Sequence, residues 1–175
     1  LDEGKVIIES NDILEYLEDK FPDPDLIPRN KFDESRKMLL AEDDLHLDLR
    51  ALSMRYVFPS DLIMRSAEDL HKYEKFGSGQ VRGMPDSHKE AELAFFRGMR
   101  ENGGITDEQV RISVERFKNA FDVMDLQLNA NSYLLGGALS AIDIAWYIYS
   151  FRLNNAGYPL HRLHRNVSKW FDLLH

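Results

Sequence analysis

Residues 133–143 read Tyr-Leu-Leu-Gly-Gly-Ala-Leu-Ser-Ala-Ile-Asp, and the end of this stretch predicts the start of a helix. Ser140 and Asp143 have the spacing of a capping box, in which each side chain bonds the backbone N–H of the other residue. Leu139 and Ile144 stand at the positions of a hydrophobic staple around the same turn. We therefore expect a helix after Ser140, and we interpret Ser140 and Asp143 as folding residues rather than catalytic ones.

Helices are predicted on both sides of this stretch. The segment from Trp146 to Phe151 is apolar all round, which favours a central, buried helix. Before it, Thr106 and Gln109 fit a second capping box at the start of a helix that reaches Leu128. Residues 38–56 have the apolar period of one long helix, and Pro59 ends it. Residues 60–104 then contain further helical segments.

The N-terminal part of the chain has a different pattern. The apolar, β-branched run Val6-Ile7-Ile8 lies between turn-forming residues and predicts a short buried strand. Ser10 is suited to cap the helix that follows, because its hydroxyl can accept from free backbone N–H groups. Prolines at 22, 24 and 28 end that helix and mark a linker. We expect domain boundaries that give residues 1–21, a linker at 22–31 and a helical domain at 32–175.

Composition excludes several classes of protein. The chain has 175 residues and a net charge of −8, and no cluster of lysine and arginine forms a nucleic-acid-binding stripe. No apolar stretch approaches the roughly 20 residues of a membrane span. With zero cysteines, these residues contain no disulfide, zinc–thiolate site or cysteine nucleophile. We expect an acidic cytoplasmic protein without a membrane span or a nucleic-acid partner.

Two stretches together resemble the glutathione S-transferase family. The first is Val6-Ile7-Ile8-Glu9-Ser10-Asn11-Asp12-Ile13-Leu14-Glu15-Tyr16-Leu17, with Phe21-Pro22 and Leu26-Ile27-Pro28 after it; the second is residues 133–143. The first is similar to the last strand and third helix of the family's thioredoxin-like domain, followed by its interdomain linker. The second is similar to the loop and capping box before the central helix of the family's C-terminal domain. The spacing between the two stretches is somewhat longer than many members need, so the resemblance implies an enlarged or unusual connection at residues 60–104. The resemblance implies a mainly α fold, with a strand-plus-helix remnant of a thioredoxin-like α/β domain and a C-terminal helical bundle.

The resemblance also implies a ligand. Matching residues in the family bind glutathione as co-substrate, which makes Glu9 and Ser10 the expected binding residues. The chemistry fits, because a helix N-terminus offers N–H groups and positive dipole charge to a carboxylate, while Glu9 can pair with the neighbouring ammonium. In the family, the long helix of the C-terminal domain lines the pocket for an apolar electrophile, so Arg50, Met54 and Tyr56 are candidate pocket residues. A second identical subunit is the expected partner.

The resemblance leaves the reaction open. The family residue that activates the glutathione thiol would precede Leu1, so we assign no catalytic residue within these 175 positions. Conjugation of glutathione to an apolar electrophile is the leading hypothesis. A non-catalytic interaction module is one alternative. A glutathione-dependent lyase, reductase or ether-cleaving enzyme on the same scaffold is another.

Two polar clusters suggest metal sites, but simpler interpretations are favoured. The acidic run Glu42, Asp43, Asp44 and Asp48 is similar to a magnesium–diphosphate motif, yet no second acidic motif accompanies it. We interpret it as a solvated helix face. His161 and His164 are three residues apart without an evident third ligand, so we interpret both as surface histidines and expect no metal site.

Overall fold

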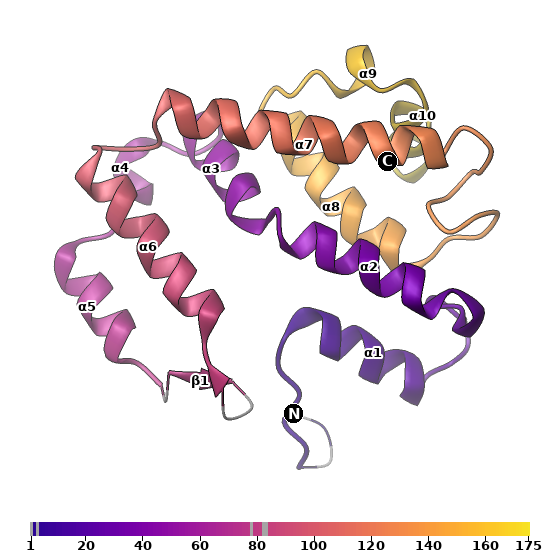
Figure 1. Ribbon diagram of the computed structural model, residues 1–175, viewed down its shortest axis with the longest axis horizontal. Coiled ribbons are helices and arrows are strands. Elements are labelled where there is room, and N and C mark those ends of the chain that lie inside the picture. The colour runs from indigo at the N-terminus through magenta and orange to yellow at the C-terminus, as the bar shows by residue number, and fades with distance from the viewer. Residues whose placement is uncertain (1, 3, 78, 82–83) are drawn as a thin grey trace.

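The protein is almost entirely helical in the computed structural model, which describes residues 2, 4–77, 79–81 and 84–175 (Figure 1). Its helices are α1 (Ser10–Lys20), η1 (Arg29–Lys31), α2 (Phe32–Asp43), α3 (His46–Tyr56), α4 (Ser60–Ile63), α5 (Ala67–Lys75), α6 (Ser87–Glu101), α7 (Asp107–Gln127), α8 (Ala141–Asn155), α9 (Leu160–Leu163) and α10 (Arg165–Leu174). Strands β1 (Gln80–Val81) and β2 (Met84–Pro85) form an antiparallel pair. No helix within the described ranges is long and apolar enough to cross a bilayer.

The main core lies where α7 crosses α3 and α8, with α2 and α10 packed around them (Figure 1). Phe117 and Phe121 of α7 are fully buried there. Their rings contact Tyr149 and Trp146 of α8 at centroid distances of 6.3 and 6.5 Å. This packing of aromatic rings places α7 and α8 at the centre of the bundle.

The capping box predicted at Ser140 and Asp143 is confirmed. The Ser140 backbone N–H donates to Asp143 Oδ2 at 2.9 Å. The second carboxylate oxygen, Oδ1, accepts from Leu134 N and from Trp170 Nε1, each at 2.8 Å. Asp143 is fully buried, so one carboxylate joins the start of α8 to the preceding loop and to α10. The second capping box is confirmed in one half: the Thr106 side chain accepts from Gln109 N at 3.1 Å, whereas no return bond from the Gln109 side chain is seen within the described part of the chain.

Two helix predictions need correction. The expected all-round burial of α8 is only partly right, because Ile144 and Ile148 are 46% and 51% exposed along one face. The single helix expected over residues 38–56 is two helices, with a turn at Asp44–Leu45. There the Leu45 N–H bonds Glu42 O instead of the carbonyl four residues back. The apolar period continues through this tighter turn, which is why the sequence pattern does not reveal the break.

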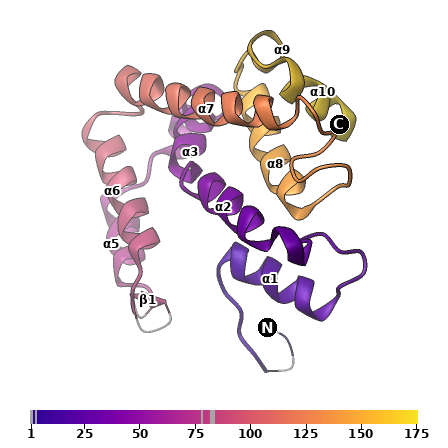
Figure 2. The ribbon, with the colours of Figure 1, turned by 45° about the vertical axis from the view of Figure 1, so that its right-hand side comes forward.

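The enlarged connection forms a helical arm with its own small core. Helices α5 and α6 pack side by side and extend away from α7 and α8 (Figure 2). Leu70 of α5 and Leu93, Phe96 and Met99 of α6 are buried together with Ala51 of α3. The arm is thus anchored to α3, and its far end lies on the same side of the molecule as α1.

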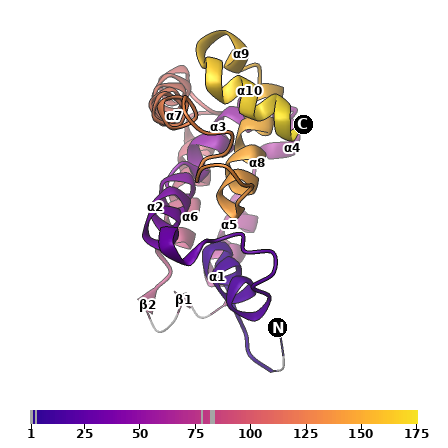
Figure 3. The same cartoon turned by 90° about the vertical axis from the view of Figure 1, so that its right-hand side faces the viewer.

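The N-terminal segment lacks the predicted strand. Residues 6–8 have no regular structure, and Val6 is 69% exposed. A strand needs a partner for its backbone groups, and no described segment pairs with this run. Helix α1 follows as expected but buries none of its side chains fully. It lies with the β1–β2 pair at the end of the molecule opposite α9 and α10 (Figure 3).

Candidate functional site

The entrance to α1 has a strained backbone at Glu9. Its φ of 69° and ψ of 129° make it the one non-glycine residue with positive φ in the described chain. Such a conformation typically costs about 1–3 kcal/mol, and it persists only where its surroundings enforce it. Residues of this kind are concentrated at binding and catalytic sites, so the strain marks this turn as a candidate site.

The predicted cap at Ser10 is wrong by one residue. Glu9 occupies the N-cap position and Ser10 is the first residue of α1, because the Ile13 N–H bonds Glu9 O at 3.0 Å. The Glu9 side chain makes no capping hydrogen bond to this terminus. The N–H groups of the first turn are therefore left for another acceptor, and the helix dipole favours a negatively charged one. Both Glu9 and Ser10 are exposed, so a small ligand can reach them.

Two further segments converge on Glu9. His88, at the start of α6, has its Nδ1 atom 3.7 Å from Glu9 Oε2. Its Nε2 atom lies 3.9 Å from Asp43 Oδ2 at the end of α2. The candidate site is thus bordered by α1, α2 and the helical arm. His88 was not predicted, because nothing in the local sequence indicates that residue 88 returns to residue 9.

A row of polar side chains continues from Asp43 along α3. Arg50 Nη2 lies 2.9 Å from His46 Nε2, and its Nη1 pairs with Glu92 of α6. Tyr73 of α5 donates to the other oxygen of Glu92 at 2.6 Å. Burial, followed by the neighbouring Arg50 guanidinium, lowers the pKa of His46. The network connects the helical arm to α3.

Glu42, on α2, lies beside this row and faces Tyr149 of α8. Burial raises the pKa of the Glu42 carboxyl to about 7. The hydrogen bond to the Tyr149 hydroxyl lowers this pKa, and the negative charge of Asp43 raises it. Burial also raises the pKa of Tyr149. The solvated acidic face expected for this run is therefore wrong at Glu42. It is also wrong at Asp48, which is buried and accepts from Ser113 Oγ at 2.7 Å.

The three candidate pocket residues lie in different surroundings. Arg50 belongs to the polar network just described, whereas Met54 packs against the small core of the arm. Tyr56 is 56% exposed at the end of α3. A hollow of about 270 Å³ lies between α5 and α6. Its lining consists of Arg65, Asp69, Leu70, Tyr73, Glu92 and Phe96. The hollow therefore shares Tyr73 and Glu92 with the network but contains none of the three candidates.

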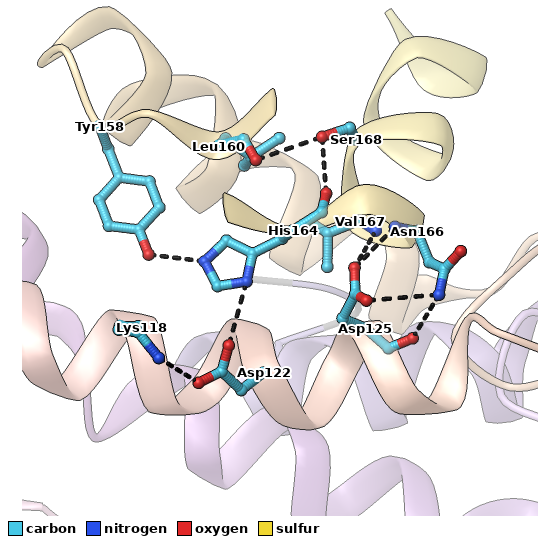
Figure 4. A network of polar contacts seen from close by, with 9 residues as sticks. All are labelled: Lys118, Asp122, Asp125, Tyr158, Leu160, His164, Asn166, Val167 and Ser168. Atoms are coloured by element: carbon cyan, nitrogen blue, oxygen red, sulfur yellow. Dashed lines mark hydrogen bonds and ion pairs between the residues drawn. The ribbon is translucent and has the colours of Figure 1, made fainter. Parts of the chain in front are cut away.

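The histidine pair divides into one surface and one core residue. His161 is exposed and lies 2.9 Å from Asp172. His164, expected at the surface, is buried: Nε2 lies 2.7 Å from the Tyr158 hydroxyl and Nδ1 lies 3.3 Å from Asp122 Oδ1 (Figure 4). Burial lowers the pKa of His164. The residues that the structure describes contain no group of three His, Cys, Asp or Glu side chains that could hold a metal ion.

Comparison with solved structures shows a glutathione-transferase-like fold. The structure is similar to the crystal structure of beta-etherase LigF from Sphingobium sp. strain SYK-6, with a TM-score of 0.73 and 20% sequence identity. The match covers 98% of this chain and 70% of that one, so the helical arm belongs to the shared fold. No family model matches the sequence, and no curated protein matches it. The likeness at this identity is one of fold.

Proposed function

We propose that this protein binds glutathione at the start of α1 and takes part in the glutathione-dependent cleavage of an ether. The observation that carries the proposal is the exposed N-terminus of α1, where the strained N-cap residue Glu9 makes no capping bond with its own side chain. Its N–H groups suit a carboxylate, and the Ser10 hydroxyl adds a donor. The γ-glutamyl end of glutathione carries an ammonium next to its carboxylate. The side-chain carboxylate of Glu9 can pair with this ammonium.

The fold likeness to a beta-etherase favours ether cleavage as the reaction. When bound, glutathione would supply a thiolate that forms a C–S bond while the ether C–O bond breaks and the leaving oxygen takes up a proton. Glu9 and Ser10 hold the γ-glutamyl end in this proposal. No residue of this chain is assigned to thiol activation.

The polar row on α3 is the proposed border of the co-substrate pocket. Arg50 is the best placed of the three candidates, because it lies in the network that joins α3 to the arm. Met54 would contribute through packing, and Tyr56 through an exposed ring at the end of α3. An apolar electrophile with an ether oxygen is the expected class of co-substrate.

Conjugation of glutathione to an apolar electrophile is the second candidate function. The same zwitterion-binding turn serves both reactions, since both begin with the same thiolate. The two reactions differ in their products: ether cleavage releases a phenol or alcohol, whereas conjugation of a haloarene releases halide.

A cytoplasmic homodimer remains the expected form of the protein.

Binding is tested by calorimetric titration with glutathione. Ser10→Ala removes one donor to a charged group and should weaken binding about tenfold. Ser132→Ala, an exposed serine in the loop before α8, is the matched control and should leave the affinity unchanged. Equal affinities in Ser10→Ala and wild type would remove Ser10 from the site.

A second assay tests the reaction. Incubation of the protein with an aryl ether and glutathione should release the phenol. Binding without either product would favour the non-catalytic module.

A further inference from the structure

His88 connects the helical arm to the turn that is proposed to bind glutathione. Its ring lies between two carboxylates from other elements, at 3.7 Å from Glu9 and 3.9 Å from Asp43. The His88 side chain is 65% exposed, so both solvent and a ligand can reach it. Neither carboxylate has another cation within ion-pair distance among the described residues.

The arm holds His88 in place from the opposite side. Asp86 caps α6 by accepting from the Lys89 N–H at 3.0 Å. The Lys89 ammonium donates to the carbonyl of Glu74 at 3.0 Å and to that of Phe76, which fastens the start of α6 to the end of α5. These hydrogen bonds hold the start of α6, where His88 lies, against the end of α5.

We propose that His88 competes with the ligand's ammonium for Glu9, so that ligand binding is coupled to release of a proton from His88. The proposal rests on the proposed glutathione site. As an imidazolium, His88 pairs with the carboxylate that the γ-glutamyl ammonium needs. Two cations on one carboxylate repel each other, so arrival of the ammonium favours the neutral imidazole. The affinity for the zwitterion should therefore fall as the pH falls and His88 becomes protonated.

The charges around His88 support this direction. Glu9 faces it from α1 and Asp43 faces it from α2, and both attract the imidazolium. On α6 itself, Asp86 lies at the cap and Lys89 is turned toward α5. Glu92, one turn further along, is paired with Arg50 of α3, whose other neighbour is His46. The ammonium of a ligand at Glu9 would thus be the nearest new cation.

The test uses calorimetric titration with S-methylglutathione at pH 5.5 and 7.5, because this ligand has no thiol to titrate. Wild-type protein should bind the ligand about five times more weakly at pH 5.5 than at pH 7.5. One proton linked to binding can change the affinity by at most about tenfold per pH unit, so this change lies within the limit. It should also release protons on binding, detected by repeating the titration in buffers of different ionisation enthalpy. His88→Gln and His88→Asn should bind with nearly equal affinity at both pH values.

His71→Gln is the matched control, since His71 is an exposed histidine on α5 that lies 3.9 Å from Glu74. It should keep the pH dependence of the wild type. If folded His88→Gln and His88→Asn keep the wild-type pH dependence, His88 is not the linked group and the inference is overturned. If wild-type protein does not bind the ligand at pH 7.5, the proposed glutathione site itself fails.

Discussion

At the residue scale, Asp143 is a buried side chain that joins the start of α8 to the preceding loop and to α10. It accepts from the backbone of Leu134 and Ser140 and from the indole of Trp170, all in the buried interior. Asp143→Ala would leave these donors without an acceptor, and each unpaired buried donor costs about 1–3 kcal/mol. We expect a loss of about 3 kcal/mol or more in the free energy of unfolding, measured by urea denaturation. Asp172→Ala, at an exposed aspartate of α10, should change it by less than about 0.5 kcal/mol.

Glu42 gives a pH-dependent prediction. Its pKa of about 7 in the folded protein lies above the ordinary value of 4.5. The folded state therefore holds this proton more tightly than the unfolded state. The resulting stabilisation is complete below pH 4.5 and is lost as the pH rises through about 7. Glu42→Gln mimics the protonated form, so it should raise the stability at pH 8 by about 1–2 kcal/mol and leave it nearly unchanged at pH 4.

The control for Glu42 is Glu101→Gln, at an exposed glutamate that ends α6. Denaturation of both variants at pH 4 and 8 separates burial of one carboxyl from a general change in net charge. An equal effect of both substitutions at pH 8 would show that burial does not disfavour the charged form of Glu42.

At the scale of elements, the sequence predicts helix starts better than helix continuity. Ser140 and Thr106 are correct because a cap is a local arrangement of four residues. The turn at Asp44–Leu45 was missed because the apolar period continues through it. The strand over residues 6–8 was predicted from its β-branched residues, but a strand also requires a partner, which those residues cannot specify.

The helices differ in how many side chains they bury, and this difference predicts which of them unfold locally most easily. Helix α1 has no fully buried residue, whereas α7 and α8 contribute Phe117, Phe121, Trp146 and Leu153 to the main core. Native-state hydrogen exchange should find the amides of α7 and α8 at least about 100-fold more protected than those of α1, because local opening of α1 exposes little apolar surface. Similar protection in all three helices would contradict this ranking.

At the scale of the whole molecule, the candidate site brings together three distant parts of the chain. Glu9 and Ser10 could be predicted because they are neighbours and their family resemblance is local. His88 and Asp43 could not, since their contact with each other depends on how the arm folds back toward α2. The sequence indicated an enlarged connection at residues 60–104, and the structure shows that its far end borders the site.

This convergence predicts that one ligand should protect two segments at once. With saturating S-methylglutathione at pH 7.5, hydrogen exchange should slow at the start of α1, where the ligand accepts from the amides, and at the start of α6, where His88 borders it. Helices α9 and α10, at the opposite end of the molecule, should be unaffected and serve as the internal control. Glu9→Gln removes the charge that attracts the ammonium, so the same ligand concentration should protect both segments less. Protection confined to α1 would show that the bound ligand does not restrict the start of α6.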